Sequence, residues 1–151
     1  SRSLPTVIID YAHTPDGLKK VLQSIKKLCK GKLITVFGCG GDRDRGKRPL
    51  MGSIAEEFSD HVFITSDNPR SEEPQKIVND ILMGIEKREK ITIDIDRFIA
   101  INESIKFANK EDIVLIAGKG HEDYQILNDK VIDFDDRKIA KKLLQEKSKS
   151  K

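Results

Sequence analysis

Tryptophan is absent from this sequence, and aromatic residues make up only 5% of its 151 residues. Basic residues exceed acidic residues by a net charge of only +3, and charges of both signs are interspersed along the chain. A nucleic-acid-binding surface usually combines a concentrated basic patch with aromatic side chains that stack on bases. The composition therefore does not favour nucleic acid as a partner.

Cysteines and long hydrophobic runs are also scarce. The two cysteines, Cys29 and Cys39, are too few for a disulfide framework and do not have the spacing of zinc ligands. No apolar run approaches the length of a membrane span, and no signal-peptide pattern opens the sequence. These features predict a cytoplasmic protein that has no membrane partner and no metal site of its own.

Segments with the periodicities of strands and helices alternate along the chain. Strands are expected at 6–11, 33–37, 61–65, 91–95 and 113–117, with a hairpin at 124–127 and 130–134. Helices are expected from 15 to about 28, from 50 to about 58, from about 73, at 97–109 and from 135 or 136. This alternation predicts an α/β fold: a doubly wound, Rossmann-like, mostly parallel sheet of about six strands with an antiparallel edge and helices on both faces. We assign residues 1–147 to one domain and expect residues 148–151 to fray.

A glycine- and arginine-rich loop, Gly38 to Arg48, lies between a predicted buried strand and a predicted helix. Three arginines and one lysine fall within its last six residues, and they offer fixed donors for carboxylate or phosphate groups. A charge cluster of this kind is also compatible with a simple solvated loop. Two further polar loops, 66–71 and 118–123, follow other predicted strands. Because ligands collect at the carboxyl ends of parallel strands, we expect the three loops to meet at one edge of the sheet.

Two standard nucleotide-binding motifs are nearly matched, and both fail. Segment 41–47 fits the first positions of a P-loop, but Arg48 stands where a serine or threonine hydroxyl must hold magnesium. Segment 38–40 begins a dinucleotide fingerprint, but Arg43 occupies the position of its third glycine. The sequence therefore has no convincing phosphate cradle, and we assign no catalytic residue to it.

The same loops suit a small zwitterion better than a phosphate. Arg43 and Arg70 offer forked donors for carboxylates, and the Asn68-Pro69 turn can aim Arg70. Acceptors for ammonium groups are Asp67, Glu122 and Asp123, with backbone groups exposed at Gly118 and Gly120.

The histidines and the single charged residues of these loops could have structural roles instead of ligand-binding roles. His13 and Asp10 lie at the end of the first strand and could contact a ribose or a base, but His13 and His121 are each more often structural histidines. Arg70 or Glu122 alone could form a loop salt bridge. We interpret Arg97 and His61 as structural.

Four motifs in the chain resemble the C-terminal domain of the Mur ligases, over a stretch from about Thr6 to Leu144. The motifs are Asp10 to Asp16 (DYAHTPD), Phe37 to Met51 (FGCGGDRDRGKRPLM), Asp67 to Arg70 (DNPR) and Ala117 to Gln125 (AGKGHEDYQ). The resemblance implies a ligase of three domains, of which the UDP-substrate domain and the central ATPase domain are absent from this sequence. It also explains why the sequence has no phosphate cradle.

The implied reaction is the ATP-dependent addition of a diamino acid to UDP-MurNAc-L-Ala-D-Glu in peptidoglycan synthesis. ATP and Mg²⁺ would be bound mainly by the absent central domain, and the UDP-MurNAc-dipeptide would be bound through the absent domains. An acyl phosphate would form on the dipeptide carboxylate and would be attacked by the incoming amine. The fragment alone is therefore expected to catalyse nothing.

The resemblance also implies residue roles. Arg43 would hold the carboxylate beside the reacting amine, and Asp67, Asn68 and Arg70, with Pro69 in the same motif, would bind the distal zwitterionic end. The Gly118 carbonyl and Glu122 would bind the distal ammonium group, and His13 and Asp10 would face the nucleotide. The Asp-Asn-Pro-Arg motif resembles the branch that adds meso-diaminopimelate rather than lysine, and only diaminopimelate has a distal carboxylate for Arg70.

Three alternatives stay open from the sequence. The chain could be a free-standing amino-acid-binding module without a ligase partner. It could also be the C-terminal domain of a folylpolyglutamate synthetase-like ligase, although the motifs around Asp67 and Gly118 suit a diamino dicarboxylic substrate better. Among such substrates, the sequence does not distinguish diaminopimelate from a close isostere such as lanthionine.

Overall fold

The computed structural model describes residues 4–150 of the chain. Its main sheet has five parallel strands in the order β1-β5-β2-β3-β4. The strands are β1 (Thr6–Asp10), β2 (Leu33–Phe37), β3 (His61–Ile64), β4 (Ile91–Ile93) and β5 (Ile113–Ala117). Every residue of β2 and β5 is buried, because helices cover both faces of a parallel sheet and leave no solvated side for polar residues.

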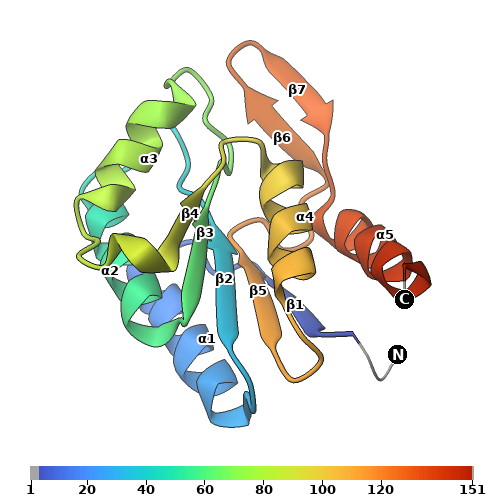
Figure 1. Cartoon of the computed structure of the whole chain (residues 1–151). Coiled ribbons are helices and arrows are strands. Elements are labelled where there is room, and N and C mark those ends of the chain that lie inside the picture. The colour runs from blue at the N-terminus through green and yellow to red at the C-terminus, as the bar shows by residue number, and fades with distance from the viewer. Residues whose placement is uncertain (1–3, 151) are drawn as a thin grey trace.

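Helices pack on both faces of this sheet (Figure 1). One face carries α1 (Pro15–Leu28), α2 (Lys47–Phe58) and α3 (Pro74–Leu82), and the other carries α4 (Arg97–Phe107) and α5 (Asp136–Lys149). A short 3₁₀ helix, η1 (Arg88–Lys90), leads into β4. The predicted start of α1 is confirmed: the Thr14 side chain accepts a hydrogen bond from the Gly17 N–H at 3.1 Å, and Pro15 is the first helical residue.

The predicted hairpin is present as β6 (Tyr124–Leu127) and β7 (Lys130–Asp133), which pair antiparallel. It forms a two-stranded sheet of its own rather than an edge of the main sheet. The α/β class and the mostly parallel pairing are confirmed, but the main sheet has five strands instead of about six. The hairpin pairs instead with a loop residue, because Arg70 forms an isolated parallel bridge with Leu127.

Element ends differ slightly from the predicted ends. β4 stops at Ile93, before the Asp96 side chain caps α4 by accepting hydrogen bonds from two backbone N–H groups. α5 extends to Lys149, two residues into the stretch 148–151 that was expected to fray. No helix in residues 4–150 is long and apolar enough to cross a membrane.

The parallel pairing brings the carboxyl ends of the strands to one edge of the sheet. Four connections begin there: residues 11–14 after β1, 38–46 after β2, 65–73 after β3 and 118–123 after β5. The candidate site is built from these four loops.

Candidate functional site

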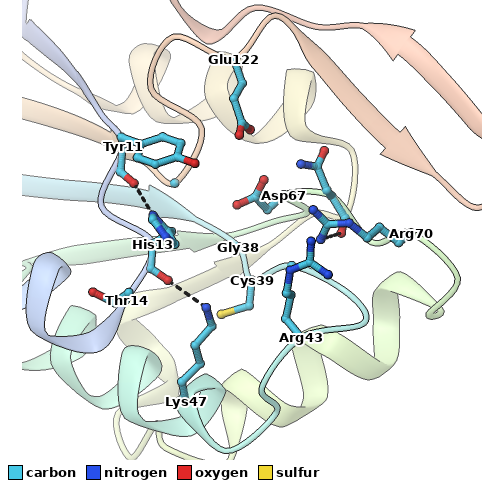
Figure 2. A pocket seen from close by; sticks show the side chains of 13 residues that line it. Tyr11, His13, Thr14, Gly38, Cys39, Arg43, Lys47, Asp67, Arg70 and Glu122 are labelled. Atoms are coloured by element: carbon cyan, nitrogen blue, oxygen red, sulfur yellow. Dashed lines mark hydrogen bonds between the residues drawn. The ribbon is translucent and has the colours of Figure 1, made fainter.

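A cavity of about 340 Å³ lies at this edge of the sheet and is lined by all four loops (Figure 2). Its lining residues are Tyr11, His13, Thr14, Gly38, Cys39, Gly40, Arg43, Lys47, Asp67, Asn68, Arg70, Gly118 and Glu122. The prediction that the loops at 38–48, 66–71 and 118–123 meet is therefore confirmed. Four of the residues named as candidates, Asp10, Pro69, Gly120 and Asp123, are not among those lining the cavity.

Charges of opposite sign are separated around the cavity. Figure 2 shows Glu122 at one end and Lys47 and Arg43 at the other, with Asp67 between them and Arg70 to one side. Such an arrangement matches the separated carboxylate and ammonium groups of an amino acid better than the uniform negative charge of a phosphate.

Arg48 holds the glycine-rich loop in place. Its side chain is fully buried, and its Nη2 donates to the Gly40 carbonyl at 2.9 Å and to Glu72 Oε2 at 2.7 Å. Its Nη1 donates to Asp80 Oδ2 at 3.0 Å. The hydrogen bond from Arg48 lowers the pKa of Glu72 to about 2. Arg48, which stands where a P-loop would have a serine or threonine, therefore links the glycine-rich loop to α3 and to the segment that precedes α3.

The loops after β2 and β3 also contact each other through their backbones. The Gly41 N–H donates to the Asn68 carbonyl at 2.8 Å, and a Cβ built on Gly41 would lie 1.8 Å from the Pro69 oxygen. Asp42 has a positive φ of 54° and its Oδ1 accepts from the Ser71 hydroxyl at 2.6 Å, which lowers the pKa of Asp42. The glycine at position 41 thus serves loop-to-loop packing and not a phosphate.

Arg70 is held in a strained backbone conformation with φ of 52°. Strand β6 fixes it there: the Arg70 N–H donates to the Ile126 carbonyl at 3.1 Å, and the Arg70 carbonyl accepts from Asn128 N–H at 2.7 Å. The guanidinium donates from Nη1 to the Gly41 carbonyl at 3.0 Å. The side chain lines the cavity with its orientation already set by neighbouring backbone.

The β6 strand also holds the rest of the Asp-Asn-Pro-Arg turn. Gln125 Nε2 donates to the Asp67 carbonyl at 2.8 Å, and the Ile126 N–H donates to Asn68 Oδ1 at 2.9 Å. The one sequence signal for this role is Gln125 itself, a polar residue within an otherwise apolar strand, which was not predicted to support the turn. The hairpin is therefore the support of the turn that carries Arg70.

The cavity lining includes residues that were given no individual role in the predicted site, among them Lys47 and Cys39. Lys47 stands in the first turn of α2, and its Nζ donates to the His13 carbonyl at 3.1 Å, which links two loops. Cys39 is buried, and this burial raises the pKa of its thiol to about 12. Cys39 is therefore a neutral wall of the cavity and not a nucleophile.

Loop 11–14 forms another wall. Its His13 Nδ1 lies 2.9 Å from the Tyr11 carbonyl oxygen, and the His13 ring packs on the Tyr11 ring with centroids 4.7 Å apart. The Asp10 carboxylate accepts the Ala12 N–H at 2.8 Å. Asp10 thus shapes the turn that leads to His13, whereas Tyr11 and His13 present their rings to the cavity.

Arg97 supports two of the site loops from below. It is fully buried, pairs with Asp136 at 2.6 Å, and donates to the carbonyls of Ser66 and Ala117 at 2.8 and 3.3 Å. These two carbonyls immediately precede Asp67 and Gly118. The interpretation of Arg97 as structural agrees with these contacts. His61 also has structural partners, since its Nε2 lies 2.8 Å from Thr92 Oγ1.

Gly118 needs to be a glycine for two reasons. Its φ is +115°, and a Cβ built on it would lie 2.9 Å from Asp67 Oδ2. The backbone at the end of β5 therefore approaches the cavity closely. Within residues 4–150, no group of three histidine, cysteine, aspartate or glutamate side chains is placed to hold a metal ion.

The fold is an α/β domain with a charged cavity at the carboxyl ends of its parallel strands. The family model described as Mur ligase, glutamate ligase domain, matches residues 1–120. The chain therefore belongs to the Mur ligase family.

Two curated relatives carry the same name, UDP-N-acetylmuramoyl-L-alanyl-D-glutamate–2,6-diaminopimelate ligase. The chain is 95% identical over 151 residues to that of Prochlorococcus marinus subsp. pastoris strain MED4, covering 100% of this chain and 30% of the relative. It is 57% identical over 145 residues to that of Syntrophomonas wolfei, covering 95% of this chain and 30% of the relative. The chain thus spans 30% of the length of each of these relatives.

Solved structures show the same fold. A structure of UDP-N-acetylmuramoyl-L-alanyl-D-glutamate–2,6-diaminopimelate ligase superposes with a TM-score of 0.90 at 41% identity, over 98% of this chain and 32% of that chain. The folylpolyglutamate synthase of Mycobacterium tuberculosis, complexed with ADP and AMPPCP, superposes with a TM-score of 0.59 at 21% identity, over 76% of this chain and 27% of that chain. The second likeness shows a shared fold alone.

Proposed function

We propose that this chain is the amino-acid-binding C-terminal domain of an ATP-dependent ligase that adds meso-diaminopimelate to UDP-MurNAc-L-Ala-D-Glu in the cytoplasm. The single observation that carries the proposal is the cavity, in which Arg43, Arg70, Asp67 and Glu122 face one small volume from three strand ends. The name of the relative that is 95% identical supports the choice of substrate.

Each end of the diamino acid has a matching group in the cavity. Arg43 pairs with the carboxylate next to the reacting amine, and Arg70 pairs with the distal carboxylate. The distal ammonium group lies against Glu122, Asp67 and the carbonyl of Gly118, which are all acceptors. Lysine lacks the distal carboxylate, so Arg70 would stay unpaired and the site would discriminate against it.

The chain contributes to the reaction by binding and orienting the nucleophilic amine. When bound, ATP with Mg²⁺ supplies the phosphoryl group that activates the dipeptide carboxylate. The exposed Tyr11 and His13 rings fit a role beside the nucleotide, because they form the wall of the cavity on the side of the first loop. Asp10 backs that loop through its bond to Ala12. In the complete ligase that we propose, the central domain would hold most of the ATP and the Mg²⁺.

A grafted ligase tests this proposal. In it, the matching segment of the Prochlorococcus marinus relative is replaced by this chain. We expect amide formation with meso-diaminopimelate and much less with lysine, and none with this chain alone. A grafted enzyme that is inactive with diaminopimelate while the parent enzyme is active would contradict the proposal. Preferential use of glutamate would favour the folylpolyglutamate synthetase-like alternative.

A further inference from the structure

Lys119 is a charged residue beneath the cavity that the proposed function leaves unused. Its side chain is fully buried, and it is not among the residues lining the cavity. Its Nζ lies 3.6 Å from Asp67 Oδ1 and 3.6 Å from Glu122 Oε1, and it donates to Asn68 Oδ1 at 3.0 Å. One buried ammonium group therefore contacts three of the residues assigned to the distal end of the substrate.

We propose that Lys119 is a positioning residue, whose ammonium group holds Asp67, Asn68 and Glu122 in the arrangement that receives the distal end of the diamino acid. This inference rests on the proposed function of the cavity. It assigns to Lys119 a role in substrate recognition without contact with the substrate.

The first argument concerns charge. Asp67 and Glu122 both approach the place where the distal ammonium group would bind, and two carboxylates with no cation between them repel each other. With Lys119 present, the three side chains carry a net charge of −1, and one substrate ammonium group brings this to zero. Lys119 thus supplies a positive charge close to two carboxylates that would otherwise repel each other in the empty cavity.

The second argument concerns the orientation of Asn68. Its Oδ1 accepts from Lys119 Nζ at 3.0 Å and from the Ile126 N–H at 2.9 Å. These two donors fix which end of the amide is the oxygen. The Nδ2 group is then the donor that Asn68 offers to the cavity, where it can assist Arg70 in binding the distal carboxylate.

The third argument concerns the cost of burial. Burial lowers the pKa of Lys119, and the nearby Asp67 and Glu122 carboxylates act in the opposite direction. An apolar side chain would fill a buried space without this penalty. The charged and titratable groups that act on Lys119 come from several elements. They are Asp67, which lines the cavity, Glu122 on its own loop, Arg97 on α4, Asp136 at the start of α5, and Tyr124, whose ring centroid lies 5.4 Å from the Lys119 Nζ.

The test uses the grafted ligase with two substitutions at this position. Lys119→Gln removes the charge but keeps a donor for Asn68, and Lys119→Arg keeps the charge. Lys90→Met is the control, because Lys90 is a half-buried lysine whose Nζ donates to the Glu56 carbonyl at 2.9 Å and which does not line the cavity. The readouts are KM and kcat for meso-diaminopimelate from pH 5.5 to 9, together with KM for ATP and thermal unfolding.

For Lys119→Gln, we expect KM for diaminopimelate to rise about tenfold with little change in kcat or in KM for ATP. We also expect the acid limb of the kcat/KM profile to move up by about one pH unit, because the uncompensated carboxylates take up a proton more readily. Lys119→Arg should leave the acid limb where it is in the wild type. Lys90→Met should change none of these quantities.

An acid limb that does not move in Lys119→Gln, whatever the change in KM, would show that Lys119 is only structural. Should Lys119→Gln fail to fold, the double variant with Glu122→Gln decides, because a removed cation is then matched by a removed carboxylate. We expect this double variant to fold, and its failure would overturn the proposal. An inactive wild-type grafted ligase would instead refute the proposed function, so the two failures are distinguishable.

Discussion

In the grafted ligase, Arg70→Ala should remove most of the proposed preference for diaminopimelate over lysine. In the wild type, Arg70 Nη1 donates to the Gly41 carbonyl at 3.0 Å and, more weakly, to the Asn68 carbonyl at 3.4 Å. These contacts leave most of the guanidinium donors free for the distal carboxylate. Alanine removes the counter-charge of that carboxylate.

The magnitude follows from the partial burial of Arg70. A charge-assisted, forked contact of this kind contributes about 2–3 kcal/mol when one partner is removed from a half-buried site. This corresponds to a loss of about 30- to 150-fold in kcat/KM for diaminopimelate. Lysine has no distal carboxylate, so its kcat/KM should change by less than about threefold.

The assay is amide formation by the grafted ligase with each amino acid, for the wild type, Arg70→Ala and the control Arg45→Ala. Arg45 lies in the same loop region and pairs with Asp80 at 3.3 Å, with a side chain that is 67% exposed, and it does not line the cavity. Backbone strain is shared by arginine and alanine at φ of 52°, so folding should be preserved. Equal losses for diaminopimelate and lysine would refute this account of selectivity.

Three further outcomes are expected. Glu72→Gln should lower the free energy of unfolding by about 2–3 kcal/mol at pH 7, measured by urea denaturation. Because the folded-state pKa of Glu72 is lowered to about 2, the difference between the wild type and the variant should vanish as the pH falls from about 4.5 towards 2. A difference that does not depend on pH would contradict the pairing of Glu72 with Arg48. Arg97→Met should cost about 3–5 kcal/mol because it strands the buried Asp136 carboxylate, and Arg97→Met with Asp136→Leu should recover much of that loss. The chain alone should show no steady ATP hydrolysis, and a turnover that survives purification from contaminants would contradict this expectation.

The sequence predicted the frame of the site well, because that frame depends on local patterns. Alternating strand and helix periodicities identified the strands, and the parallel-sheet rule then placed the loops after β2, β3 and β5 at one edge. The charges that line the cavity, such as Arg43 and Glu122, could be named because they lie in those loops.

The supports of the site could not be predicted, because each depends on a partner distant in sequence. Arg48 bonds to Glu72, 24 residues away, and Gln125 bonds to Asp67, 58 residues away. No local motif marks either pair. The hairpin was expected at an edge of the main sheet, but its backbone partner is Arg70 in the loop after β3. This partner is also distant in sequence, so no local pattern could predict it. The sequence gives no sign of the role of Lys119, because its contacts with Asp67 and Glu122 depend on the fold.

The most direct measurement of the central claim is a crystal structure of the grafted ligase with meso-diaminopimelate bound. We predict the diamino acid in the four-loop cavity, with its distal carboxylate paired to Arg70 and its distal ammonium group within hydrogen-bond distance of Glu122 and the Gly118 carbonyl. Diaminopimelate bound elsewhere, or bound in this cavity with Arg70 facing solvent, would contradict the account.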